Sequence, residues 1–153
     1  MTQVALQSQN NSSVAKEMKV VLADSYALYL KTQNYHWNVT GPNFKALHLL
    51  FEEQYNDLAL AVDEIAERIR SLGEKAPGTW SAYSGVTSIK EGDENAKAED
   101  MVAELANDQA IMVKTLQSAL KAAQEVGDEV TIGILVDRMT VHEKAAWMLR
   151  SSI

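Results

Sequence analysis

The chain has 153 residues, of which 46% are hydrophobic and 23% are charged, a balance that fits one domain with a packed core rather than a disordered tail. It has no cysteine, which excludes disulfide scaffolds, thiolate zinc sites and cysteine nucleophiles, so any metal site must use nitrogen and oxygen ligands. The formal net charge of -7 argues against a protein whose whole surface binds nucleic acid and favours one that attracts cations.

Neither a targeting signal nor a membrane span is expected. Residues 1–13 read MTQVALQSQNNSS, with neither a basic start nor an apolar stretch of signal-peptide length. The longest aliphatic runs cover about five residues, whereas crossing a bilayer takes about 20. The sequence therefore predicts a soluble, cytoplasmic protein with no membrane partner.

Helical periodicity follows a polar start. Residues 1–12 are rich in Gln, Asn and Ser and predict a flexible N-terminal arm, and residues 13–153 predict a single helical domain. From Val14 onward, apolar side chains recur every three, four or seven residues, which is typical of an amphipathic helix facing a core. The Gly-Pro turn at residues 41–42 is expected to end this first helix.

One long connection separates two pairs of helices. The second helix is predicted from a cap at Asn43 to about residues 72–73. Residues 74–97 then form the only long connection, in which Trp80–Tyr83 suggests a short helix. Apolar spacing predicts two more helices, through residues 102–120 and from about residue 130 to residue 150. Two short turns and one long crossover indicate an all-α, ferritin-like four-helix bundle.

Histidines and carboxylates are the residues most able to carry chemistry. His36 and His48 flank the turn between the first two helices, which brings them to about the same height in the hairpin. On the second helix, four metal-ligating side chains share one stripe that spans about 100° around the axis. They are His48, Glu52, Asp63 and Glu67. This polar stripe lies beside the predicted apolar stripe, so a second surface is expected to face it.

The length of that stripe limits the kind of site it can form. From His48 to Asp63 the helix rises roughly 22 Å, so the two ends cannot bind one ion within one chain. Two copies packed antiparallel near residues 56–58 would bring His48 and Glu52 of one chain to the distal carboxylates of the other. Mixed histidine and carboxylate ligation suits Fe(II). The alternative is that these carboxylates form an ordinary solvated helix face.

The segment from His36 to Arg70, HWNVTGPNFKALH followed by LLFEEQYNDLALAVDEIAERIR, resembles the signature of the Dps family of ferritin-like mini-cages. The resemblance extends to VHEKAAWMLR at residues 141–150 and covers the chain from about Val14 to its end. It implies a hollow homo-dodecamer built from two-fold dimers. It also implies a di-iron ferroxidase centre shared between two subunits.

The resemblance assigns five residues to that centre: His36, His48 and Glu52 from one subunit, with Asp63 and Glu67 from its partner. The two distal carboxylates would anchor the tighter iron, the histidines would complete the site, and Glu52 would bridge two metals. Trp37 matches the aromatic residue beside the family's centre, where it would intercept a stray radical or serve only as an interface aromatic. The implied reaction oxidises Fe(II) with hydrogen peroxide, in preference to dioxygen, and stores Fe(III) oxide in the cage, which protects against oxidative stress.

Residues near the last predicted helix have weaker interpretations. Asp128 and Glu129 match a region that lines three-fold pores in the family, where acidic side chains would attract iron, but a capping role for Asp128 is equally open. Gly133 stands where some members carry another pore acid. His142 and Glu143 lack the second histidine of a zinc-protease helix and are interpreted as structural. No histidine stands at Glu-x-x-His spacing, so an intrachain di-iron site is not expected.

DNA binding in this family depends on basic termini rather than on the cage. The N-terminal arm has no lysine or arginine before Lys16, so DNA binding is expected to be weak or absent at physiological salt. Two alternatives to the ferroxidase remain. One is a DNA-binding, nucleoid-compacting Dps protein whose iron chemistry is secondary. The other is a helical scaffold that binds another divalent metal, or none.

Overall fold

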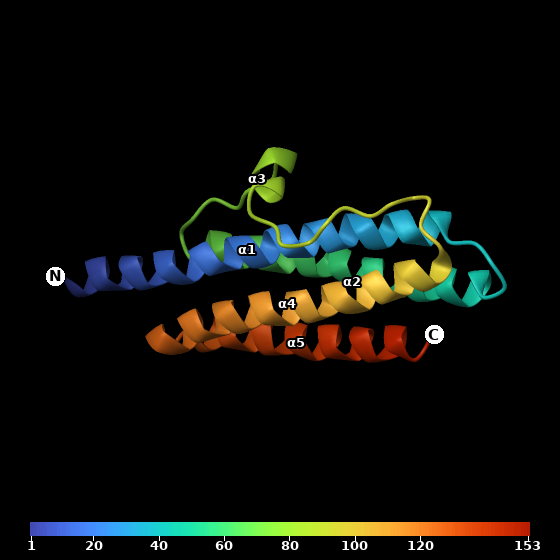
Figure 1. Cartoon of the computed structure of the whole chain (residues 1–153). Coiled ribbons are helices and arrows are strands. Elements are labelled where there is room, and N and C mark those ends of the chain that lie inside the picture. The colour runs from blue at the N-terminus through green and yellow to red at the C-terminus, as the bar shows by residue number, and fades with distance from the viewer.

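The computed structural model describes residues 1–153, which form five helices. In chain order these are α1 (Gln3–Asn38), α2 (Phe44–Ser71), α3 (Trp80–Ser84), α4 (Ala98–Val126) and α5 (Glu129–Arg150). The four long helices form a bundle in which α1 pairs with α2 and α4 pairs with α5 (Figure 1). None of them has both the length and the apolar character that a membrane span requires. The predicted one-crossover bundle is confirmed.

Apolar side chains from all four long helices fill the core. Fully buried members include Leu22 and Leu28 of α1, Phe51 and Ile65 of α2, Leu105 and Met112 of α4, and Leu135 and Leu149 of α5. They recur at the spacings that place side chains on one face of a helix. The polar stripe of α2 therefore stays outside the core, as the periodicity predicts.

The crossover from α2 to α4 runs along α1, and Figure 1 shows α3 on the far side of α1 from α5. Asp24 of α1 holds this segment, because its Oδ1 accepts hydrogen bonds from the Thr87 hydroxyl at 2.7 Å and the Ser88 N–H at 2.8 Å. Gly92 lies so close to α1 that a Cβ there would be 3.0 Å from the ring of Tyr35. The crossover is thus a fixed part of the subunit.

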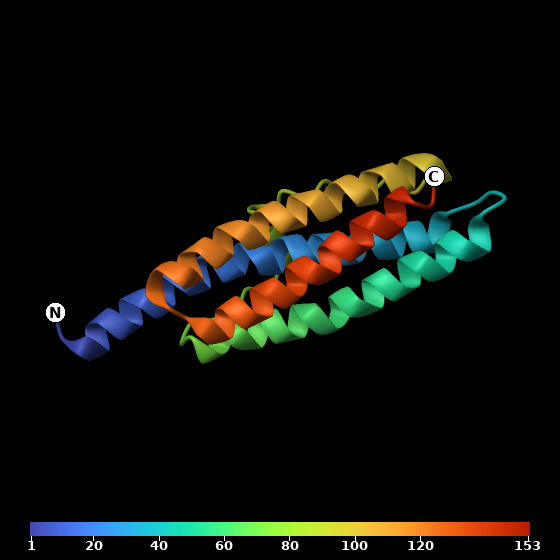
Figure 2. The ribbon, with the colours of Figure 1, turned by 90° about the horizontal axis from the view of Figure 1, so that it is seen from below.

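The first helix begins at Gln3, well before the predicted start at Val14. Thr2 caps it, because its Oγ1 accepts a hydrogen bond from the Ala5 N–H at 3.1 Å. Figure 2 shows these first turns projecting beyond the rest of the bundle. Elongating an existing helix is far less costly than nucleating one, so Gln, Asn and Ser can be helical here. The arm predicted for residues 1–12 is therefore helical, and its flexibility stays a prediction.

Two short turns close the helical pairs. Asn43 occupies the N-cap position of α2, but its side chain makes no capping hydrogen bond, in contrast to the prediction. Gly127 ends α4 in the left-handed conformation, with φ 68°, which favours a residue without Cβ. Asp128 follows at once as the N-cap of α5.

Candidate metal centre

His36 and His48 face each other across the hairpin of α1 and α2. Their ring centroids are 3.8 Å apart and their planes differ by 15°. The Nδ1 atom of each ring lies 2.7 Å from the backbone carbonyl oxygen of the other histidine. A carbonyl oxygen only accepts, so both Nδ1 atoms carry a proton and donate it. In the neutral imidazole with its proton on Nδ1, Nε2 keeps a lone pair, which is the state in which a histidine binds a metal ion.

The surroundings of the histidine pair are partly aromatic. The ring of Tyr55 lies 5.1 Å from that of His36, and the ring of Phe44 lies 5.0 Å from that of His48. Trp37 follows His36, but its side chain is 61% exposed and none of the aromatic ring pairs includes it. Its expected role beside the centre therefore stays a prediction.

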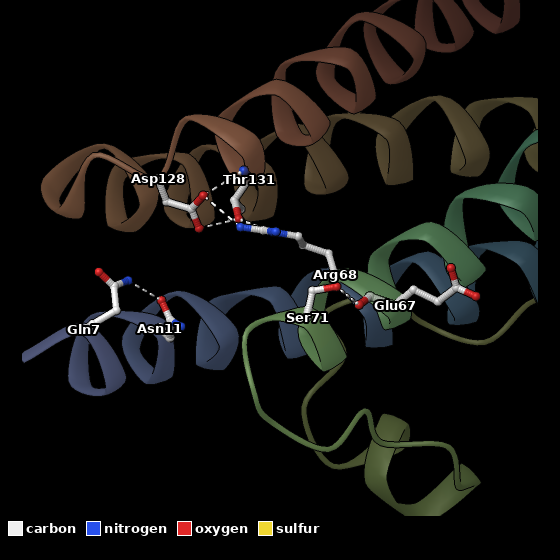
Figure 3. A network of polar contacts seen from close by, with 7 residues as sticks. All are labelled: Gln7, Asn11, Glu67, Arg68, Ser71, Asp128 and Thr131. Carbon is white, nitrogen blue, oxygen red and sulfur yellow. Dashed lines mark hydrogen bonds and ion pairs between the residues drawn. The ribbon is translucent and has the colours of Figure 1, made fainter. Parts of the chain in front are cut away.

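The carboxylates of the predicted centre are unpaired in the subunit. Glu52 is half-buried one turn after His48, whereas Asp63 and Glu67 are exposed further along α2. None of their carboxylate oxygens takes part in an ion pair. In Figure 3 the carboxylate of Glu67 points away from the neighbouring Arg68. The only hydrogen bond at Glu67 outside the helix ladder joins its backbone oxygen to the hydroxyl of Ser71.

The subunit alone therefore brings together only part of the predicted set of five ligands. It brings His36 and His48 together and keeps Glu52 one helical turn away, but it leaves Asp63 roughly 22 Å from His48 along the helix. No group of three or more His, Asp or Glu side chains in the chain could hold a metal ion. Any site that uses the whole set needs residues from two chains.

Several polar side chains inside the bundle are paired with one another. Lys31 of α1 lies 2.8 Å from the carboxylate of Asp108 on α4, and both side chains are buried. His142 of α5 donates from Nδ1 to Gln109, and its Nε2 accepts from Arg138 at 3.2 Å. Burial and the Arg138 charge lower the pKa of His142 to about 3, so this ring is neutral. His142 therefore has the structural role expected for it.

Asp128 makes a compact network at the start of α5 (Figure 3). Its Oδ1 accepts from the Thr131 N–H and from Arg68 of α2, both at 3.0 Å, and its Oδ2 accepts from the Thr131 hydroxyl at 2.6 Å. Burial raises the pKa of Asp128, but the hydrogen bonds from Thr131 and the charge of Arg68 outweigh it and leave the pKa below its usual value. The capping role is confirmed, and the pore role of Asp128 and of the exposed Glu129 stays a prediction.

Two contacts here were not predicted from the sequence. The Lys31–Asp108 ion pair joins residues from α1 and α4, and Arg138 of α5 pairs with Asp57 of α2 at 2.9 Å. The one available signal was that Lys31, Asp108 and Arg138 are charged residues at buried positions of otherwise apolar helix faces. Such a position does not identify its partner across the bundle.

Comparison with known proteins defines the class of this fold. A family model described as a ferritin-like domain matches residues 15–153. Among solved structures, a Dps protein from Bacillus brevis superposes with a TM-score of 0.90 at 35% identity, covering 99% of this chain and 98% of the other. A DPS protein from Vibrio cholerae O1, described as a member of a broad superfamily of ferritin-like diiron-carboxylate proteins, gives a TM-score of 0.90 at 33% identity, covering 94% and 91%.

The class is thus the ferritin-like helical bundle. A relative found by sequence indicates the family within this class. DNA protection during starvation protein 2 of Bacillus anthracis is 39% identical over 141 residues, which is 92% of this chain and 97% of the relative. The chain belongs to the Dps family of ferritin-like proteins.

Proposed function

We propose that this protein is a mini-ferritin of the cytoplasm that binds Fe(II) at centres shared between two subunits, oxidises it preferably with hydrogen peroxide, and stores Fe(III) oxide in a dodecameric cage. The observation that carries the proposal is the histidine pair, in which two reciprocal hydrogen bonds of 2.7 Å leave both Nε2 atoms free for a metal. Imidazole nitrogens beside free carboxylates form a donor set that suits Fe(II).

The exposed face of α2 supports a centre shared between chains. Leu49 and Leu60 lie on the same face as the polar stripe and are 46% and 77% exposed. Exposed apolar side chains beside unpaired carboxylates are typical of a surface that a second molecule covers. An antiparallel pairing of two α2 helices about residues 56–58 would bury both leucines and bring Asp63 and Glu67 of each chain to the histidines of the other.

In this proposal the chain's own residues position and separate the irons. Asp63 and Glu67 of the partner chain would anchor the tighter iron, His36 and His48 would complete the site through Nε2, and Glu52 would bridge the two metals. Two Fe(II) ions held together can reduce peroxide in one two-electron event, in which H2O2, two Fe(II) and two protons give two Fe(III) and two water molecules. No hydroxyl radical is released, because the peroxide bond takes both electrons at once.

The test is anaerobic loading with Fe(II) followed by peroxide, with Fe(III) absorbance and the ratio of iron to peroxide as readouts. We expect two Fe(II) oxidised per peroxide and a severe loss of rate in the His36→Ala, His48→Ala double variant. Neighbouring carboxylates supply matched controls: Glu52→Gln and Asp63→Asn should slow oxidation, whereas Glu53→Gln and Glu64→Gln should not. Unchanged oxidation in the double variant would contradict the proposal.

The proposed particle has a defined mass. Twelve chains of 16.9 kDa give roughly 200 kDa for a closed homo-oligomer. Light scattering or native mass spectrometry of the purified protein measures this mass directly. A monomeric particle at micromolar concentration would rule out the shared centre.

DNA binding is expected to be weak or absent. The exposed first turns of α1 carry Gln, Asn and Ser, and the first basic side chain is that of Lys16. Affinity for DNA depends on phosphate contacts from lysine and arginine, and repetition over twelve copies adds nothing if each copy contributes none. A gel shift at about 150 mM salt should show no complex. A complex that persists there would favour the DNA-compacting alternative.

A further inference from the structure

A continuous series of aromatic rings leads from the histidine pair to the crossover. The ring of His36 lies 5.1 Å from that of Tyr55, which lies 5.9 Å from that of Tyr29. Tyr29 in turn lies 5.9 Å from Tyr26, and Tyr26 lies 5.8 Å from the indole of Trp80 on α3. Each centroid distance falls within the range in which aromatic rings contact one another. Three helices thus contribute to one unbroken line of rings.

The composition of this ring series suits the transfer of single electrons. Three of the chain's five tyrosines belong to it, and tyrosine and tryptophan are the side chains that most readily give up a single electron. Tyr35 and Tyr83, the tyrosines outside it, donate their hydroxyl protons to Glu104 and to the Pro77 carbonyl oxygen. The hydroxyls of the ring series have no partner in the subunit and are not buried, so solvent can take their protons.

We propose, building on the ferroxidase function, that Tyr55, Tyr29 and Tyr26 carry single oxidising equivalents from the histidine pair to Trp80. The source is peroxide that meets one Fe(II) instead of two, which gives Fe(III), hydroxide and a hydroxyl radical. That radical takes a hydrogen atom from the Tyr55 hydroxyl, and water and a Tyr55 phenoxyl radical result.

Each later step moves one electron towards the oxidised ring. Tyr29 gives an electron to the Tyr55 radical and releases its phenolic proton to solvent, and Tyr55 takes up one proton. The same exchange passes the radical to Tyr26 and then to Trp80, which loses its indole proton. A dissolved hydrogen-atom donor, such as ascorbate, restores the Trp80 indole. Without a donor, a ring carbon of the indolyl radical forms a bond to dioxygen, and the peroxyl radical that results keeps both oxygen atoms on the ring.

This route protects the histidines that bind iron. A hydroxyl radical formed beside His36 would otherwise attack the imidazoles, and each oxidised ring would disable a centre. Tyr26 and Trp80 also line an open groove of about 880 Å³ between α1 and the crossover, through which a small reductant reaches them in the subunit. Trp37 is a neighbour of His36 in the chain but has no ring contact that would connect it to this series.

The experiment supplies one Fe(II) per subunit and then one peroxide in air, without added reductant. Two readouts are used: the tyrosyl radical signal in freeze-quenched EPR spectra, and peptide mass spectrometry of oxygen added to each tryptophan. Trp147 of α5 is the internal control, because it is 61% exposed in the subunit against 65% for Trp80 and lies outside the ring series. We expect a tyrosyl signal and more oxygen on Trp80 than on Trp147.

Tyr29→Phe keeps the ring in place and removes the group that can be oxidised. Tyr29→Phe should leave the rate of Fe(II) oxidation unchanged and abolish the excess of oxygen on Trp80 over Trp147. Tyr83→Phe is the matched control, since this ring stacks on Tyr26 at 5.0 Å but lies off the route, and it should keep the excess. With radicals generated in bulk by chelated iron, wild type and Tyr29→Phe should be oxidised alike.

Equal oxygen on Trp80 and Trp147 in the wild-type protein would overturn the proposed route, as would an excess on Trp80 that survives Tyr29→Phe. Either result could arise while Fe(II) oxidation proceeds normally, so it would leave the ferroxidase function intact. If wild-type protein failed to oxidise Fe(II) at all, the ferroxidase function and this route would fail together.

Discussion

The reciprocal hydrogen bonds of His36 and His48 show how backbone carbonyl groups can fix the orientation of two imidazoles. His36 lies in the last turn of α1, where carbonyl oxygens lack a partner within the helix. Nδ1 of His48 satisfies that oxygen at 2.7 Å, and the bond in turn fixes the orientation of the imidazole. The spacing of the two histidines predicts their proximity, but not this exchange, because the exchange depends on where α1 ends.

The lowered pKa of His142 predicts that the stability of the folded protein depends on pH. Its pKa is lowered to about 3 in the folded protein by burial and by Arg138, against 6.5 in the unfolded chain. The unfolded state therefore binds the proton first as the pH falls, so stability is lost below pH 6.5 and the loss continues towards pH 3. The slope from this one group is about 1.4 kcal/mol per pH unit for each subunit.

Replacing the His142 imidazole removes its contribution to the change of stability with pH. In urea unfolding followed by circular dichroism between pH 7 and pH 5, His142→Gln should be less stable than wild type at neutral pH, since the hydrogen bond to Gln109 is altered. The difference in the free energy of unfolding between wild type and His142→Gln should narrow as the solution is acidified. Only the wild-type chain has an imidazole at this position that gains a proton on unfolding. A gap that stays constant with pH would show that His142 is not held neutral.

At the scale of elements, the start of α5 depends on Asp128. Its carboxylate accepts from the Thr131 N–H at 3.0 Å and pairs with Arg68 of α2, so it caps one helix and joins it to another. Asp128→Ala should cost about 0.5–2 kcal/mol, the usual range for losing an N-cap. Thermal unfolding checks this, with the exposed neighbour substituted as Glu129→Gln for comparison. Equal melting temperatures for the two variants would contradict the capping role.

The crossover offers a second test at this scale. A Cβ at Gly92 would lie 3.0 Å from the Tyr35 ring and 3.1 Å from Lys31 Cγ, and both residues are buried. Gly92→Ala should therefore destabilise the subunit by about 1–3 kcal/mol, as overpacked cores do. Gly78→Ala in the same crossover meets no atom within 4 Å and should be close to neutral. A neutral Gly92→Ala would mean that the crossover is not pressed against α1.

The elements themselves follow from periodicity, and their ends follow from local chemistry that periodicity detects less well. The four long helices and the short one at Trp80 are where the apolar pattern predicts them. The early start of α1 at Gln3 has no apolar signal, because those turns pack against nothing and extend an already formed helix. The pairing of Lys31 with Asp108 could not be predicted either, because a charge at an apolar position does not identify its partner, and only the packed bundle brings the two residues together.

At the scale of the whole molecule, the sequence predicts that one chain cannot bring all five predicted ligands to a single metal centre. The rise of α2 separates His48 from Asp63 by roughly 22 Å, and the folded subunit has no cluster of three metal ligands. What neither helical rise nor the subunit determines is the position of the partner chain. That position decides which carboxylates reach which histidines, so the shared centre has to be tested by mixing chains.

Two inactive variants should restore activity when they assemble together. One carries His36→Ala and His48→Ala, the other carries Asp63→Ala and Glu67→Ala, and each alone should lack ferroxidase activity. In a mixed dimer, one centre takes histidines from the second variant and carboxylates from the first, and is intact, while the other centre lacks both. Random pairing from an equal mixture makes half of the dimers mixed, so about a quarter of wild-type activity should return. If each centre belonged to a single chain, no mixture of the two variants would recover any activity.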